Sequence, residues 1–152
     1  MGALFLSGQL ASAADCDPAY ADLKGDWGQA RFSVEVVDTP RSRALGLMGR
    51  ETMAQSHGML FLFEAPQEVS FWMKDTLIPL DMLFLHSDGT VARVHENAVP
   101  HDLTLIPGGQ DILAVLEVNG GIADRFGINE GTVLRHPMLD QDAAAWACDS
   151  AK

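Results

Sequence analysis

The stretch VSFWMKDTLIPLDMLFL, residues 69–85, joins the most apolar run of the chain to a short polar break. Residues 69–74 alternate between two sets of side chains, which is typical of a strand with two different faces. Residues 80–85 are almost entirely apolar, which predicts a strand covered on both sides. Pro79 has no backbone N–H to donate, so the break between these strands is predicted within residues 76–79. Two strands therefore flank a polar corner.

The composition is that of one acidic domain. A chain of 152 residues with 47% hydrophobic residues is long enough for one hydrophobic core and too short for two comfortable domains. Its formal net charge is -11, so nucleic-acid backbones and anionic membrane surfaces would be repelled. No segment is long and apolar enough to be predicted as a membrane span. We therefore expect neither nucleic acid nor a bilayer as a partner.

The first residues have the pattern of a secretory signal peptide. An apolar run from Ala3 to Leu10 leads into Ala11-Ser12-Ala13, a small-x-small cleavage pattern, although the usual preceding basic residues are missing. We therefore predict a periplasmic or secreted protein. In an exported protein the two cysteines, Cys16 and Cys148, suggest a disulfide. According to the loop-entropy model, a disulfide that closes the long loop between these two cysteines stabilises the fold by roughly 4–5 kcal/mol.

Short strands and turns are predicted along the rest of the chain. Residues 31–37 alternate as a half-buried strand does, and residues 58–63 form an apolar run that predicts a buried one. Thr39-Pro40 predicts the start of a short amphipathic helix, which we expect to end at Gly49. Asp88-Gly89 predicts a tight hairpin turn.

Further strands are predicted at residues 90–96, 112–118 and 132–136, and a single helical turn at residues 122–126. A turn is predicted at residues 64–66, and residues 100–109 are predicted as a loop. Six or seven short strands with one or two small helices favour a mainly β fold, an antiparallel sandwich or squashed barrel.

These patterns divide the chain into four parts. We predict a signal peptide at residues 1–13, a tether or edge strand at residues 14–30, a single β domain at residues 31–138 and a C-terminal tail at residues 139–152.

Four stretches together resemble the bacterial and archaeal family called domain of unknown function 192. They are GLMGRETM (46–53), GMLFLF (58–63), FWMKDTLIPLDMLFL (71–85) and VLEVNGGIADRFGINEG (115–131). The resemblance implies an all-β, jelly-roll-like sandwich that is commonly exported and has no established activity, so it identifies no functional residue. The family generally has Asn where Asp75 stands and Asp where Thr132 stands.

The polar corner is the first candidate site. Asp and Thr side chains readily bond to backbone groups in turns, so this corner is either a hydrogen-bonded turn or a site facing a ligand. In the second interpretation Trp72 provides an apolar platform beside the polar groups. Its residues are Trp72, Lys74, Asp75 and Thr76.

Two acids inside apolar strands form the second candidate site. Asp81 and Glu117 must be paired, ligated or functional, because an isolated buried charge is costly. They could face each other as a general acid/base pair or bind a metal. They could equally be structural carboxylates, each paired with a cation such as Arg50 or Lys74.

Motifs for other chemistry are missing from the sequence. The five histidines show no zinc-binding spacing, and there is no GxSxG, P-loop or dinucleotide motif. We therefore expect no cofactor and no metal. The leading hypothesis is an exported binding or accessory domain that holds a small polar ligand or a partner's loop at the corner. The alternatives are a hydrolase or lyase that uses Asp81 and Glu117, and a structural or interaction module without a ligand.

Overall fold

A computed structural model describes residues 16–148, so the predicted signal peptide lies outside the described residues. The described chain is mainly β, as predicted, with seven strands and two short helices. No helix among the described residues has the length and apolarity needed to cross a membrane. The elements are β1 (Tyr20–Gly25), β2 (Gly28–Val37), α1 (Pro40–Leu45), β3 (His57–Phe71), β4 (Leu80–Leu85), β5 (Val91–Ala98), β6 (Ile106–Asn119), α2 (Ile122–Phe126) and β7 (Val133–Arg135).

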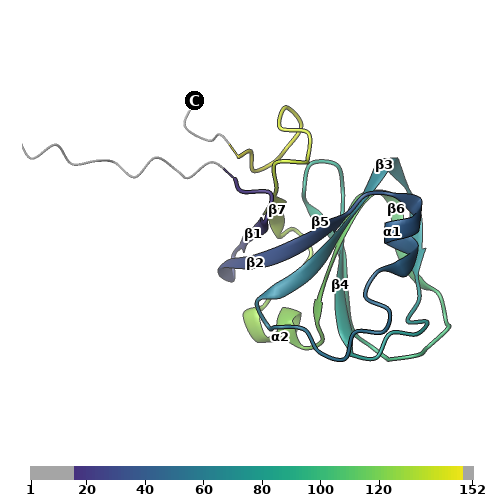
Figure 1. Cartoon of the computed structure of the whole chain (residues 1–152). Helices are drawn as coiled ribbons and strands as arrows, with labels where there is room; N and C mark the ends of the chain where they lie inside the picture. The colour runs from purple at the N-terminus through teal and green to yellow at the C-terminus, as the bar shows by residue number, and fades with distance from the viewer. Residues whose placement is uncertain (1–15, 149–152) are drawn as a thin grey trace, which may run out of the picture.

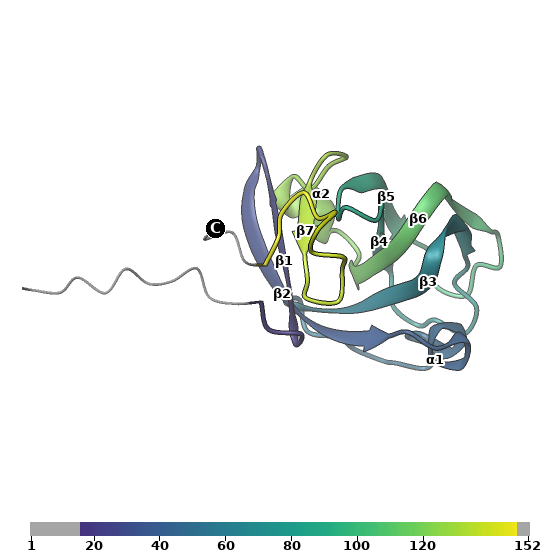
Figure 2. The same cartoon turned by 90° about the horizontal axis from the view of Figure 1, so that it is seen from above.

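All seven strands belong to one sheet with the order β5-β4-β6-β3-β2-β1-β7. Neighbouring strands are antiparallel except β2 and β3, which run parallel. The sheet is strongly curled, as Figures 1 and 2 show from two directions. A bridge between Thr90 and Val133 joins the two ends of the strand order. Of the two predicted architectures, the curled sheet therefore corresponds to the barrel.

The inside of the curl holds a continuous apolar core. Every strand contributes to it, and α2 adds Ile122 and Ala123. One buried residue from each strand illustrates this: Leu23, Phe32, Leu60, Leu83, Val91, Leu116 and Leu134. This core explains why β4 has no exposed residue, because its other face is covered as well.

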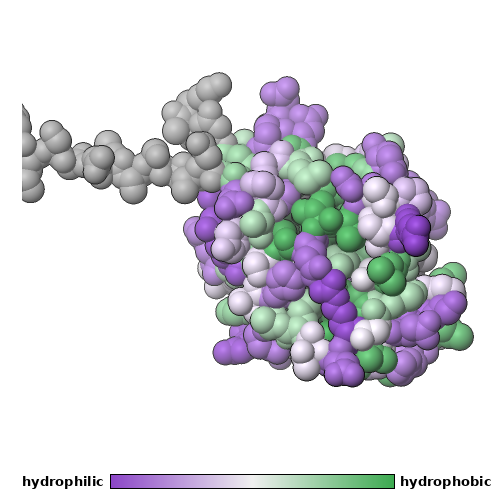
Figure 3. Space-filling model, in the orientation of Figure 1, coloured by the Kyte–Doolittle hydropathy of each residue, from purple (hydrophilic) through white to green (hydrophobic). Residues whose placement is uncertain are grey.

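A second apolar cluster covers the outer face of the strands β3, β4 and β6. It includes Phe61, Phe84 and Val115, and Leu47 just after α1 packs onto it. Figure 3 shows the face that carries β2 and α1, where apolar residues are visible between polar ones. The space between α1 and this outer cluster is where the candidate site lies.

The helix α1 begins at the predicted residue. Thr39 accepts a hydrogen bond from the backbone N–H of Ser42, and the Ser42 hydroxyl accepts one from the N–H of Thr39. This reciprocal cap and Pro40 at the first helical position define the start. The helix ends earlier than predicted, at Gly46 instead of Gly49, and Gly46 has a positive φ of 47°. The helix is therefore only six residues long.

Two sequence predictions about loops are wrong. The predicted turn at residues 64–66 lies inside β3, which runs through it as one strand with shifts in its register to β6. These bulges absorb the extra residues, so Pro66 sits where the ladder is interrupted. The predicted loop at residues 100–109 ends earlier, because β6 already begins at Ile106.

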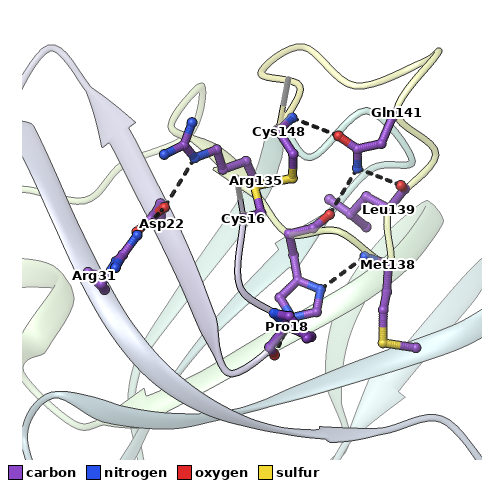
Figure 4. Close-up of a disulfide and its surroundings, with 10 residues drawn as sticks. Cys16, Pro18, Asp22, Arg31, Arg135, Met138, Leu139, Gln141 and Cys148 are labelled. Atoms are coloured by element: carbon purple, nitrogen blue, oxygen red, sulfur yellow. Dashed lines mark hydrogen bonds and ion pairs between the residues drawn. A yellow bond between two sulfur atoms is a disulfide. The ribbon is translucent and has the colours of Figure 1, made fainter. Parts of the chain in front are cut away.

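Both ends of the described chain are attached to the barrel. Residues 20–30, predicted as part of a tether or edge strand, form β1 and the start of β2, and β1 lies between β2 and β7. The predicted tail also folds back, since Leu139 is buried in the inner core. Cys16 and Cys148 form a disulfide, which Figure 4 shows above β1.

A buried histidine reinforces this closure. The imidazole Nε2 of His136 lies 2.8 Å from the carbonyl oxygen of Pro18, and Nδ1 accepts a hydrogen bond from the N–H of Met138. The ring therefore links the segment before β1 to the segment after β7. Burial lowers the pKa of His136, so the neutral ring is favoured.

Candidate functional site

A pocket of about 430 Å³ lies between α1 and the outer face of the strands β3 and β6. The segment from Pro40 to Met48 forms one wall, and β3 with the following Trp72 forms the other. A volume near 400 Å³ lies at the small end of the range for ligand pockets. The pocket is therefore sized for a compact molecule.

Glu117 borders this pocket from β6, and only 5% of the residue is exposed. It pairs with Met59 on β3 and with Met82 on β4, and cross-strand partners in antiparallel pairs project on the same face of a sheet. Two thioether side chains thus flank the carboxyl group. Within residues 16–148 the carboxyl group has neither a hydrogen-bond partner nor an ion-pair partner.

Burial raises the pKa of Glu117 from its ordinary 4.5 to about 8. The cause is desolvation alone, because removing a carboxylate from water without a compensating partner disfavours the charged form. At neutral pH the side chain is therefore mainly a neutral carboxylic acid, which can donate one hydrogen bond and accept others. Strongly perturbed acids in a pocket are typical of functional sites.

Aromatic rings form much of the pocket wall. Phe61 and Phe71 pack edge to face with their centroids 5.1 Å apart. The four aromatic residues that line the pocket are Phe61, Phe63, Phe71 and Trp72. These rings share the lining with polar side chains, which include Gln67, Glu68 and Ser70 besides Glu117.

The only lysine or arginine among the lining residues is Arg43, and its guanidinium is already occupied. Its Nη1 donates to the backbone carbonyls of Asp38 and Leu62, both at 2.8 Å. Its Nη2 lies 3.0 Å from a carboxylate oxygen of Glu64, and the group lies 5.0 Å from the ring centre of Phe63. Arg43 therefore holds α1 against β3 and does not neutralise Glu117.

The polar corner contributes two of its four residues to the pocket, Trp72 and Thr76. The side chain of Thr76 is buried and its hydroxyl donates to the carbonyl of Lys74. Trp72 is 44% exposed and stands at the rim. The Lys74 ammonium lies 5.4 Å from the centre of its ring, a cation–π distance.

Asp75 has a turn role and does not line the pocket. Its φ of 51° lies in the left-handed region, which Asn and Asp tolerate better than other residues with side chains. Its backbone carbonyl accepts from the N–H of Gly49. The Asn that the family generally carries there would suit the same backbone conformation.

Asp81 does not face Glu117, so the predicted carboxylate pair is wrong. Asp81 pairs with Val118, which packs in the inner core, while Glu117 pairs with Met82 in the outer cluster. The two acids lie on opposite faces of the sheet because adjacent strand residues alternate sides. No cleft can hold both carboxyl groups.

Asp81 is a structural acid. Its two oxygens accept from the backbone N–H groups of Asn97 and Ala123, each at 2.8 Å. Ala123 lies in the first turn of α2, whose N-cap is a glycine without a side-chain cap. Asp81 therefore caps α2 from the neighbouring strand and holds Asn97 near the end of β5, where the register between β4 and β5 shifts. Its partners are backbone amides, not the predicted Arg50 or Lys74.

Sequence reasoning found the acid and the tryptophan of the pocket but missed most of its walls. The helix residues and the phenylalanines read as ordinary apolar positions. One signal was available, since Phe61 and Phe63 alternate on β3 as Glu117 and Val115 do on β6. Alternate residues of two adjacent strands can share one face of a sheet. The sequence does not show, however, that β3 pairs with β6.

Comparisons with known proteins agree with this fold. A crystal structure of a protein of unknown function from Novosphingobium aromaticivorans DSM 12444 is 40% identical, covers 76% of this chain and 83% of its own, and has a TM-score of 0.75. A Sinorhizobium meliloti 1021 structure, described as a candidate transcription regulator, is 41% identical, covers 80% and 95%, and also has a TM-score of 0.75. A search of curated proteins found no match. The family model DUF192, described as "Uncharacterized ACR", matches residues 22–136, and the chain therefore belongs to the domain of unknown function 192 family.

Proposed function

We propose that this protein is an exported binding domain that holds a compact ligand in the pocket above Glu117. One observation carries the proposal: the carboxyl group of the nearly buried Glu117, which has no partner among the described residues, opens onto a cavity of ligand size. A purely structural acid would be expected to have its hydrogen bonds satisfied by the chain, as Asp81 has. A bound molecule would supply the missing partner.

The proposed site revises the predicted one. Trp72 and Thr76 remain, and Glu117 moves from an acid pair to the centre of the site. Lys74 and Asp75 become supporting residues, one stacked on the exposed tryptophan and one in the adjacent turn. The proposal keeps the binding hypothesis but places the ligand beside Glu117 instead of at the corner of Trp72, Lys74, Asp75 and Thr76.

Export is part of the proposal. It is supported by the signal-like pattern in residues 1–13 and by the disulfide between Cys16 and Cys148, since disulfides persist mainly in oxidising compartments. The description of the Sinorhizobium protein as a candidate transcription regulator finds little support in this chain. A net charge of -11 disfavours contact with nucleic acid.

The test is a ligand-observed NMR screen with a library of small neutral, anionic and cationic compounds. Ala44 is exposed and lines the pocket, so Ala44→Trp should obstruct the cavity without disturbing the core. Ala65→Trp adds the same bulk at an exposed position outside the pocket. We expect compounds whose affinity falls about tenfold or more in Ala44→Trp and stays unchanged in Ala65→Trp. A library without any such compound would refute the proposal.

A further inference from the structure

The class of ligand can be deduced from what the pocket lacks. Glu117 is a potential anion without a cationic partner among residues 16–148, and its neighbours Met59 and Met82 provide none. The arginine of the pocket lining and the arginine suggested by the sequence as a partner both bind other acids. Arg43 binds Glu64, and Arg50 binds Glu35. A buried carboxyl group that faces a cavity is complemented best by a positive group that arrives with the ligand.

The aromatic walls favour a cation for a second reason. The face of an aromatic ring is electron-rich and attracts positive charge, most strongly where water is excluded. Two rings of the pocket already do this at its edge, because Arg43 lies over Phe63 and Lys74 lies over Trp72. Phe61 and Phe71, which also line the cavity, hold no cation of the described chain.

The charge of the whole chain points the same way. It carries 21 acidic and 10 basic residues, and an excess of one sign raises the local concentration of oppositely charged small molecules. Glu68 adds a further acid to the lining of the pocket. An anionic ligand would have to enter against this field.

We propose that the ligand is a small organic cation, with an ammonium group paired to Glu117 and an apolar part against Phe61 and Phe71. This inference rests on the proposed binding function and names its ligand class. A cavity of about 430 Å³ suits one ring or a short chain attached to the charged group.

Proton exchange distinguishes this ligand class from others. Glu117 holds its proton at neutral pH because burial raises its pKa to about 8. When an ammonium ion binds, the carboxyl group ionises and its proton passes to the buffer, so each bound cation replaces one proton. Affinity should then rise close to tenfold per pH unit between pH 6 and 7. A neutral ligand would bind the protonated acid without releasing a proton.

The probes are benzylammonium, benzyl alcohol and benzoate, three molecules of one shape that differ in charge. Their affinities for the full disulfide-bonded chain are measured by NMR titration at pH 6, 7 and 8. Calorimetry in phosphate and Tris buffers counts the protons released. We expect benzylammonium to bind about tenfold more tightly than either other probe at pH 7, with nearly one proton released per ligand.

The variants are Glu117→Gln and Glu130→Gln. Both remove one negative charge, but Glu130 is exposed and lies outside the pocket. We expect Glu117→Gln to weaken benzylammonium about tenfold or more and to abolish the pH dependence, while Glu130→Gln changes neither. An unchanged pH dependence in Glu117→Gln would overturn the inference. Tighter binding of the alcohol or of benzoate, blocked by Ala44→Trp, would overturn the ligand class and leave the binding function standing.

Discussion

Asp81 and Glu117 stand in adjacent strands of one sheet and are both buried, yet their surroundings are opposite. Asp81 receives two backbone N–H groups at 2.8 Å. Glu117 receives none from the described residues and borders a cavity. An acid in an apolar strand can therefore have either a structural or a functional role. The face on which it lies, and the backbone groups that end there, decide between a structural and a functional role.

The largest expected effect concerns Asp81. Replacing it by alanine leaves the buried N–H of Ala123 and the partly buried N–H of Asn97 without an acceptor and removes the cap of α2. Each unsatisfied group costs about 1–3 kcal/mol, so Asp81→Ala should lower the free energy of unfolding by about 2–6 kcal/mol. Urea unfolding with the disulfide intact measures the loss.

Asp81→Asn is the matched control, because the amide keeps one acceptor oxygen of the same shape. We expect it to lose only part of the stability that Asp81→Ala loses. If Asp81→Ala unfolds at the same urea concentration as the wild type, the hydrogen bonds to Asp81 do not stabilise the fold, and its structural role is contradicted.

The next effect concerns Glu117 and pH. Its pKa is raised in the folded state from 4.5 to about 8, so below pH 4.5 both states are protonated and the full stability is present. Between pH 4.5 and 8 the unfolded state ionises first and stability falls, and above pH 8 it levels off. Relative to the wild type, Glu117→Gln should therefore gain about 2–4 kcal/mol between pH 5 and 7.5.

The difference between the two unfolding free energies, measured by urea titration at several pH values, isolates this effect. Burial lowers the pKa of His136, so this ring also makes stability depend on pH, but its contribution is common to both proteins. Two curves that run parallel from pH 5 to 8 would show that Glu117 is ionised in the folded state. Asp81 and Glu117 would then differ only in their hydrogen-bond partners and not in their protonation.

The smallest effect concerns a third acid, Glu35, which lies on β2 near the surface. Its carboxylate receives hydrogen bonds from Arg50 and His57. The Arg50 hydrogen bond is the main cause that lowers its pKa from 4.5 to about 2. Stability from this group is thus present above pH 4.5 and lost as pH falls toward 2.

Because the Glu35 side chain is 41% exposed, Glu35→Gln should lose only about 1 kcal/mol at pH 7. The measurement is thermal or urea unfolding at pH 7 and pH 3, and the difference between the variant and the wild type should be smaller at pH 3. If Glu35→Gln loses as much free energy of unfolding as Asp81→Ala, solvent exposure does not explain how much each acid stabilises the fold.

Local chemistry made much of the fold predictable. Thr39-Pro40 marks the start of α1, Asp88-Gly89 marks the hairpin, and the all-apolar β4 is covered on both sides. The strand order was not predictable, because β2 pairs with β3 in parallel and β4 pairs with β6 rather than β3. Such long-range pairings leave no mark in local periodicity.

The same limit explains the mixed outcome for the candidate site. Burial of Asp81 and Glu117 followed from their apolar neighbours, but which face each one occupies depends on the register between strands. Of the residues predicted from the polar break, Trp72 and Thr76 line the pocket. Their position in the break did not separate them from Lys74 and Asp75, which are not among the lining residues.

The bond between Cys16 and Cys148 has a consequence for how the molecule is presented. Figures 1 and 2 place the two ends of the described chain together beside β1 and β7, while α1 and the pocket wall lie at the other end of the molecule. The polypeptide therefore enters and leaves the described fold at one place, so a module fused directly before Cys16 or after Cys148 would be attached on the side of the molecule away from α1.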